Sequence, residues 1–254
     1  MTPASSCVPL AVVIGCTPAL GSENYILKRH GIAGQAACKA WPMQLLLVRH
    51  ALPLRSEHGE GSDPDLSDTG IAQVARLPEA LARFPISRVV SSPQRRAVQT
   101  AEPVAAAFDL SIDIDDRFAE YDRDLPVYIP VEQIREENPR EWARMAQGHL
   151  PSAVDEDAFR ARVRAAVDDV VISADPDDTI AAFSHGGVIN VVLHEILGTA
   201  RLLSFPIDYA SVTRLLFSRS GQATVVTVNA TEHVWDLLPR NRRLLGDEAG
   251  RGAG

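Results

Sequence analysis

The sequence predicts an α/β fold, specifically a three-layer α/β/α sandwich with a mostly parallel central sheet and an antiparallel edge hairpin. Residues 45–49 and 178–183 are short, nearly continuous apolar runs, which are typical of central parallel strands covered on both faces. Segments with helical spacing separate these runs, as in α/β proteins. Two late strand-like segments, 211–217 and 223–228, flank Ser220 and Gly221 and favour a hairpin.

Composition indicates a globular protein. The chain has 254 residues, with 33 acidic and 25 basic side chains and a formal net charge of −8. Such a length supports one large α/β domain or two small ones. The acidic balance argues against a nucleic-acid partner or an anionic membrane surface. Cys7, Cys16 and Cys38 all precede residue 39, so a disulfide framework for the main domain is excluded.

We expect residues 1–42 to form an extension outside the fold. The apolar run 8–15 is too short to span a bilayer. No basic residue precedes it, which disfavours a secretory signal, although Val13 to Cys16 resembles a lipoprotein cleavage box. The expected domain is 43–239, the segment 240–254 is expected to be a frayed tail, and the expected location is cytoplasmic.

The first half of the domain contains a helix, a strand, a helix and a strand. Ser67 or Asp68 is expected to cap a helix that runs to about residue 83. Residues 86–91 form the second predicted strand. Ser92 and Pro93 then suit the N-cap and first position of a helix over 93–108, and residues 110–114 form the third strand.

An irregular insertion separates these elements from the second half. Residues 121–150 contain three prolines and a predicted helix over 131–147 that is interrupted or restarted near Pro139. Insertions of this kind typically cover a site. A helix over 155–173 has its apolar residues on one face. After the strand 178–183, an apolar helix is predicted over 188–197.

Charged side chains lie at the carboxyl ends of both apolar strands, where ligands bind in open α/β sheets. Arg49 and His50 end the first strand, and His185 and Gly186 follow the other, so we expect the two strands to be neighbours in the sheet. Between these two strands in the sequence, Arg95 and Arg96 lie in the first turn of a predicted helix. Basic residues there oppose the helix dipole, which favours a bound anion such as phosphate. Taken alone, the Arg95–Arg96 pair has an alternative interpretation, in which both arginines are solvated and bind no anion.

These parts suit phosphoryl transfer, in which positioning and charge stabilisation lower most of the barrier. A neutral imidazole can attack phosphorus and carry the group covalently. Arginine matches the phosphoryl oxygens bidentately. A carboxylic acid near the leaving oxygen would complete the set.

The motifs together resemble the histidine phosphatase superfamily, the phosphoglycerate mutase-like proteins. They are L-x-V-R-H at 46–50, D-L-S-D-T-G at 65–70, S-S-P-Q-R-R-A-V-Q-T-A at 91–101, S-H-G-G at 184–187 and N-A-T-E-H at 229–233. Each motif alone is weak, but their order and spacing are specific. The resemblance covers about residues 44–237.

The resemblance implies a role for each matching residue. His50 would be the nucleophile that becomes phosphorylated. Arg49, Arg96 and His185 would bind the phosphoryl oxygens, with a further backbone N–H from Gly186, and Arg95 would be peripheral. Glu120 would protonate the leaving group and then activate water. Asp122 and Asp124 are rival candidates for the acid.

Departures from the family pattern favour a phosphatase over a mutase. Ala51 and Leu52 stand where the family usually has Gly and Glu, and Ser56 aligns with a frequent Asn, so it is included among the phosphate ligands. Arg55 and His58 in the same loop are expected to be solvated, and contact with the substrate is the alternative for them. A mutase-type phosphotransferase is the alternative enzyme, and a weakly active or inactive phosphate-binding interaction module is the alternative from another class.

No cofactor or metal is expected. His194 and Glu195 lack the second histidine of an H-E-x-x-H zinc motif, so His194 is given a structural role. The expected partner is a small phosphorylated substrate, with no nucleic acid and no membrane. The oligomeric state stays open.

Overall fold

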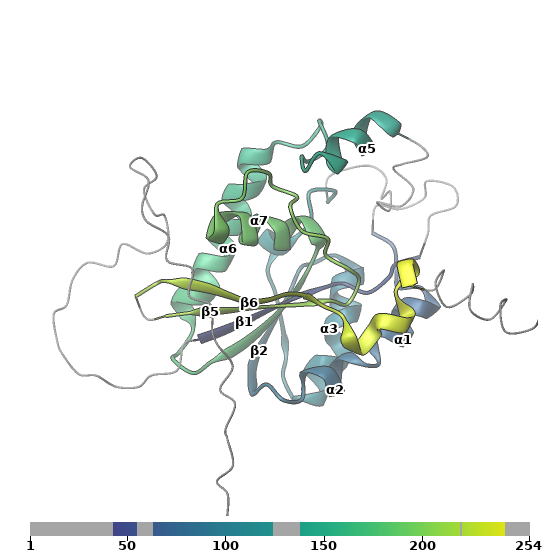
Figure 1. Cartoon of the computed structure of the whole chain (residues 1–254). Coiled ribbons are helices and arrows are strands. Elements are labelled where there is room, and N and C mark those ends of the chain that lie inside the picture. Colours follow the sequence, from purple (N-terminus) through teal and green to yellow (C-terminus); the bar gives the residue numbers. More distant parts are fainter. Residues whose placement is uncertain (1–42, 55–62, 124–137, 219, 242–254) are drawn as a thin grey trace, which may run out of the picture.

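The computed structural model describes residues 43–54, 63–123, 138–218 and 220–241, and these form a single six-stranded sheet (Figure 1). The strands are β1 (Met43–Arg49), β2 (Ile86–Ser91), β3 (Ile112–Ile114), β4 (Thr179–Ser184), β5 (Val212–Phe217) and β6 (Ala223–Ala230). Their order is β3-β2-β4-β1-β5-β6. The first four in this order are parallel, whereas β5 and β6 continue the sheet antiparallel. The predicted fold class is confirmed.

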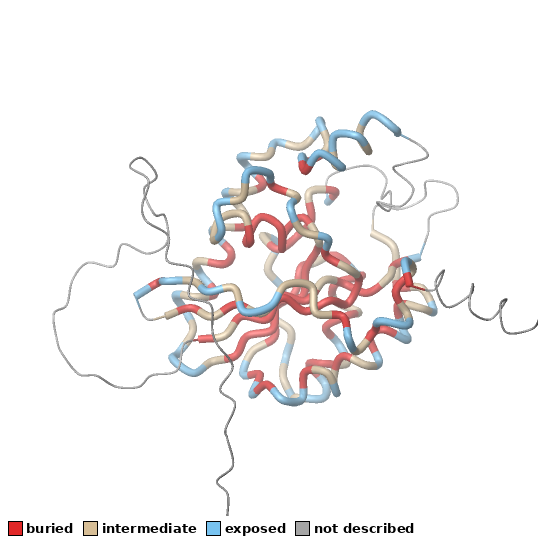
Figure 2. The backbone as a smooth tube through the Cα atoms, in the orientation of Figure 1, coloured by how far each residue is buried: buried red, intermediate tan, exposed pale blue. Residues whose placement is uncertain are grey.

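Helices cover both faces of the sheet, and alternate residues of β1 point to opposite layers. Leu45 and Leu47 belong to the apolar cluster formed with α6 (Glu156–Ser173) and α7 (Gly186–Leu197). Leu46 and Val48 belong to the cluster on the other face, with α1 (Asp68–Val74), α2 (Leu77–Leu81) and α3 (Arg95–Ala107). Burial of each such side chain contributes about 1.5–3 kcal/mol. Figure 2 shows the resulting buried centre.

The helix predicted from Ser67 to about residue 83 is two helices. Ser67 is the N-cap of α1, where its hydroxyl accepts a hydrogen bond from the Gly70 N–H at 3.1 Å. The chain turns between α1 and α2, and Pro78 lies in the first turn of α2. Proline has no N–H to continue a helix, so a single helix through this position was a wrong expectation.

The helix predicted from residue 93 begins two residues later. In α3 the N-cap position is Gln94, whose side chain makes no capping hydrogen bond. The prediction that Ser92 caps this helix is wrong, because its hydroxyl is hydrogen bonded to the ring of His185.

Farther along, α5 (Pro139–Ala146) restarts at Pro139, as predicted, with Asn138 as its N-cap. Residues 131–137 of the predicted 131–147 helix lie outside the described residues, and Gln147 is the C-cap of α5. In Figure 1, α5 lies beyond α6 and α7, away from the sheet. The predicted 155–173 helix is α6, capped by Asp155, and α7 begins at Gly186, two residues before the predicted start.

The two strands that end in a histidine are neighbours, as the sequence predicts. β1 and β4 are parallel, with Arg49 opposite Ser184. The carboxyl ends of both strands therefore bring Arg49–His50 and Ser184–His185 to one place at the sheet edge.

After β6 comes a short 3-10 helix, Glu232–Leu237. Of the segment expected to fray, Arg240 pairs with Asp208 at 2.7 Å, and the Asn241 amide donates to the Trp235 carbonyl at 2.9 Å. Residues 1–42 and 242–254 lie outside the described residues. Within the described part of the chain, none of the helices has the length and apolar character needed to cross a membrane.

Candidate active site

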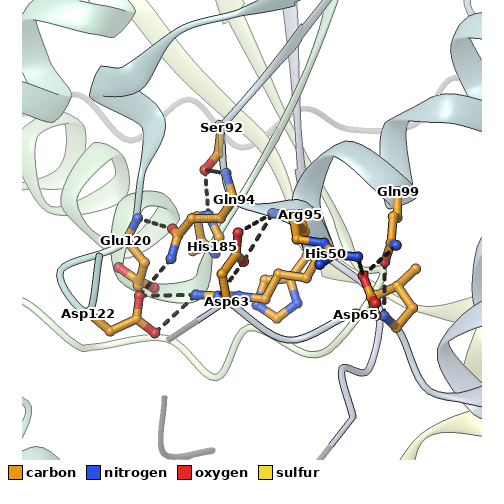
Figure 3. A network of polar contacts seen from close by, with 12 residues as sticks. His50, Asp63, Asp65, Ser92, Gln94, Arg95, Gln99, Glu120, Asp122 and His185 are labelled. Atoms are coloured by element: carbon orange, nitrogen blue, oxygen red, sulfur yellow. Dashed lines mark hydrogen bonds and ion pairs between the residues drawn. The ribbon is translucent and has the colours of Figure 1, made fainter. Parts of the chain in front are cut away.

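Two buried histidines face each other at the ends of β1 and β4. The ring centroids of His50 and His185 are 5.0 Å apart, with the planes tilted by 54°. His50 is 3% exposed and His185 is 0% exposed. Figure 3 shows them within a network of polar side chains contributed by the strand ends, the start of α3 and the segment after β3.

His50 has a fixed tautomer. Its Nδ1 lies 2.8 Å from the carbonyl oxygen of Ala51, and because a carbonyl can only accept, Nδ1 carries the hydrogen. The other ring nitrogen, Nε2, then holds the lone pair. Burial, followed by the charges of Arg96 and Arg49, lowers the pKa of His50 well below its usual value. The imidazole is therefore neutral near pH 7, the form that can act as a nucleophile.

His185 presents one nitrogen with no partner. Its Nε2 is hydrogen bonded to the Ser92 hydroxyl at 2.8 Å, whereas its buried Nδ1 has no hydrogen-bond partner among the described residues. Burial, followed by the charge of Arg96, lowers its pKa well below the usual value. A buried polar atom without a partner suits a ligand group.

The Arg49 guanidinium is held by the segment before β5. It donates to the carbonyl of Ile207, and its central carbon lies 3.9 Å from the centre of the Tyr209 ring. The same ring lies 5.6 Å from that of His50. A Cβ on Gly186 would lie 3.7 Å from Arg49 Nε, so Gly186 lies next to this guanidinium, as expected for residues that share a ligand.

Arg96 is fully buried and ion-paired with two carboxylates. Its Nη2 lies 3.0 Å from both oxygens of Asp122, and its Nη1 lies 3.4 Å from Asp63. The Asp63 carboxylate also accepts from the backbone N–H of Arg95 at 2.8 Å. A protein carboxylate thus lies at the start of α3, where the sequence predicts an anion. The side chain of Arg95 is 62% exposed and pairs with Asp65, a peripheral position.

Glu120 is buried against the first turn of α7. One carboxyl oxygen accepts from the Gly187 N–H at 2.8 Å and the other from the Tyr121 N–H at 3.1 Å. A Cβ at Gly187 would lie only 2.3 Å from the carboxyl oxygen, so this close approach requires glycine. Burial, followed by the charge of Asp122, raises the pKa of Glu120 to about 7, which suits a group that both gives and takes a proton near neutral pH.

The described part of the site thus contains five of the expected residues and Gly186. The candidate phosphate ligand Ser56, its loop neighbours Arg55 and His58, and the rival acid Asp124 lie outside the described residues. His194 Nδ1 lies 2.9 Å from the Thr199 hydroxyl, consistent with a structural role. No group of three His, Cys, Asp or Glu in the described segments could hold a metal ion.

Sequence reasoning missed Gln94 and Tyr209, and it considered Asp122 only as a rival acid. Gln94 hydrogen bonds to both Glu120 and Asp122. The position of Gln94 inside the S-S-P-Q-R-R motif, two residues before the predicted phosphate ligand Arg96, could have indicated that it lies in the site. Tyr209 follows the second histidine by 24 residues, and no local pattern links it to Arg49.

Comparisons with known proteins agree with this geometry. A model of the histidine phosphatase superfamily (branch 1) matches residues 45–231. A bifunctional protein of Mycobacterium tuberculosis is 30% identical in an alignment 211 residues long, which covers 79% of this chain and 57% of that protein. Phosphoserine phosphatase 1 of Hydrogenobacter thermophilus is 32% identical over 108 residues, or 41% of this chain and 51% of that enzyme. The solved structure of a mycobacterial glucosyl-3-phosphoglycerate phosphatase has a TM-score of 0.62 and 25% identity, over 74% of this chain and 98% of that one.

This chain spans little more than half the length of these two relatives compared by sequence. The family match, in contrast, covers most of β1, both histidine motifs and the hairpin. The chain therefore belongs to the histidine phosphatase superfamily, branch 1, the family that its motifs predict.

Proposed function

We propose that the chain is a phosphomonoester hydrolase that works through a phosphohistidine on His50. One observation carries the proposal: the neutral His50 ring, held by the Ala51 carbonyl, lies 5.0 Å from that of His185. Arg49 precedes His50 in the chain, and the buried carboxyl of Glu120 accepts from the N–H of Gly187, two residues after His185. The set supplies a nucleophile, cationic and N–H donors and an acid.

In the first step, the lone pair of His50 Nε2 attacks phosphorus and the bond from phosphorus to the leaving oxygen breaks. Protonated Glu120 donates its proton to that oxygen, so the products are an alcohol, a phosphohistidine and the Glu120 carboxylate. Arg49, Arg96 and the Gly186 N–H stabilise the charge on the phosphoryl oxygens. The unpartnered Nδ1 of His185 donates to the same oxygens.

In the second step, the Glu120 carboxylate takes a proton from water and the water oxygen attacks phosphorus. The bond between phosphorus and Nε2 breaks, inorganic phosphate leaves, and Glu120 is again protonated. A carboxyl with a pKa of about 7 is populated in both forms near neutral pH, as this exchange requires. Ser56, proposed from the sequence as a further phosphate ligand, lies outside the described residues.

The proposed substrate is a small phosphorylated metabolite. Two of the compared proteins bear the names glucosyl-3-phosphoglycerate phosphatase and phosphoserine phosphatase, and both substrates carry a phosphomonoester next to further polar groups. The cytoplasmic location expected from the sequence stays a prediction.

The test is to trap the intermediate. The enzyme is mixed with a 32P-labelled phosphomonoester and quenched in alkaline detergent, because phosphohistidine is labile in acid. Wild type and His194→Ala, which changes a histidine bonded to Thr199, should both carry label on His50. His50→Ala should carry none. If the wild-type chain takes no label and hydrolyses none of a panel of phosphomonoesters, the proposal is wrong and a phosphate-binding interaction module is favoured.

The same panel separates hydrolase from mutase. Assays with and without added bisphosphoglycerate measure phosphate release and phosphoryl transfer in parallel. We expect release to dominate, since Ala51 and Leu52 depart from the Gly-Glu that the family pattern has after the first histidine. Rapid transfer with negligible release would reverse the choice in favour of the mutase.

A further inference from the structure

We propose that Gln94 is a positioning residue that holds the Glu120 segment against the histidine pair. The inference rests on the proposed function, because it assigns Gln94 a role through the proposed acid. Gln94 is 5% exposed. It stands at the N-cap position of α3 but does not cap the helix, because its side chain is engaged elsewhere.

The side-chain amide of Gln94 spans both ends of the acidic segment. Its Oε1 accepts from the backbone N–H of Glu120 at 2.8 Å, and its Nε2 donates to Asp122 Oδ1 at 2.9 Å. A backbone N–H can only donate and a carboxylate can only accept. The amide orientation is therefore fixed by its partners, and neither bond could form if the amide were flipped.

The hydrogen bonds of Gln94 also connect it to two other groups of the proposed mechanism, Arg96 and His185. Asp122 binds Arg96 through both carboxylate oxygens, so the Nε2 bond ties the acidic segment to a proposed phosphate ligand. The backbone N–H of Gln94 lies 3.3 Å from the Ser92 hydroxyl, which is bonded to His185. Figure 3 shows Gln94 between Ser92, Glu120 and Asp122.

A general acid acts only within hydrogen-bond reach of the leaving oxygen, and small displacements of catalytic groups lower rates strongly. Loss of the Gln94 amide leaves the Glu120 N–H without its acceptor and removes one donor from Asp122. The acid should shift, whereas His50, with its own anchor on Ala51, should stay in place.

The test compares Gln94→Leu with Gln99→Leu. Gln99 lies on the same helix and makes the same kind of bridge, since its Oε1 accepts from the Leu66 N–H at 2.9 Å and its Nε2 donates to Asp65 at 2.8 Å. We measure kcat/KM for p-nitrophenyl phosphate, whose leaving group needs little protonation, and for phosphoserine, whose alkoxide needs a proton. Thermal unfolding and label on His50 show whether each variant is folded.

Gln94→Leu should lower kcat/KM for phosphoserine by about tenfold to a hundredfold and for p-nitrophenyl phosphate much less. Gln99→Leu should change both by the same factor. Equal losses on the two substrates in Gln94→Leu, or no loss, would overturn the inference while label on His50 still supported the hydrolase. If wild type neither hydrolyses the esters nor takes label, the proposed function fails and the role of Gln94 fails with it.

A second variant keeps the test open if Gln94→Leu does not fold. Gln94→Glu retains an acceptor for the Glu120 N–H but places a carboxylate against that of Asp122. The added negative charge should move the alkaline limb of kcat/KM for phosphoserine to higher pH. An unmoved limb in the folded variant would contradict the proposed position of Gln94.

Discussion

Arg96 donates from Nη2 to both carboxylate oxygens of Asp122, at 3.0 Å each, and its side chain is fully buried. Asp122 also raises the pKa of Glu120 through its charge, as a second cause after burial. One aspartate therefore orients a proposed phosphate ligand and keeps the proposed acid protonated to higher pH.

Asp122→Asn should move the alkaline limb of kcat/KM to lower pH. The amide carries no charge, so the pKa of Glu120 falls toward its ordinary value and less of the acid is protonated at neutral pH. The measurement is the pH profile with phosphoserine or another alkyl phosphate between pH 5 and 9. Asp65→Asn, which changes a carboxylate paired with the peripheral Arg95, is the control and should leave the limb in place. A limb that moves to higher pH would refute this coupling.

Gly187→Ala should lower kcat by about a hundredfold. The added Cβ would lie 2.3 Å from a Glu120 oxygen and 3.0 Å from the Tyr121 ring, so the carboxyl must shift. Gly186→Ala is the matched comparison, because its Cβ would lie 3.7 Å from the nearest atom, Arg49 Nε, an ordinary contact. Steady-state kinetics on both variants decide the matter, and equal losses would show that Glu120 is not the group disturbed.

The sequence predicted the sheet and the residues at the carboxyl ends of the two histidine strands because these features follow from local patterns. Apolar runs such as 45–49 show burial on both faces, and the end of a strand fixes where Arg49 and His50 lie. The predicted continuous helix over 67–83 failed at Pro78, where the missing N–H outweighs the helical spacing on both sides.

Long-range contacts between side chains could not be predicted. Nothing near Arg96 in sequence shows that Asp122, 26 residues away, neutralises it, or that Tyr209 stacks on Arg49. The Ser92 hydroxyl suited an N-cap on local grounds, but the fold brings it against His185. Contacts of this kind depend on how β4 and the segment after β3 meet, and a single sequence does not encode that in any local pattern.

The buried histidines should make the native state sensitive to acid. The pKa values of His50 and His185 lie well below their usual value because of burial. As the pH falls below about 6.5, the unfolded chain binds protons that the native state does not, so stability falls. Glu120 has the opposite effect on stability. Its pKa is raised to about 7, so as the pH falls the native state gains this proton before the unfolded chain does, and the native state is stabilised.

Comparison with a variant isolates the histidine contribution. The urea midpoint of wild type and of the His50→Gln, His185→Gln double variant is measured at pH 7.5 and 5.0. Glu120 is present in both, so the extra loss in wild type on acidification comes from the histidines. If the double variant loses as much as wild type, the two rings are not the buried neutral groups that the site requires.

Tyr209 should strengthen phosphate binding through its ring. The Arg49 guanidinium carbon lies 3.9 Å from the ring centre, and a cation–π contact of this kind contributes about 0.5–2 kcal/mol. Tyr209→Leu should therefore weaken competitive inhibition by inorganic phosphate by roughly 2- to 30-fold, because the guanidinium loses the surface that orients it. Tyr209→Phe retains the ring and should bind phosphate nearly as well as wild type. If Tyr209→Phe binds as poorly as Tyr209→Leu, the hydroxyl and not the ring is responsible, and the stacking on Arg49 contributes little to the site.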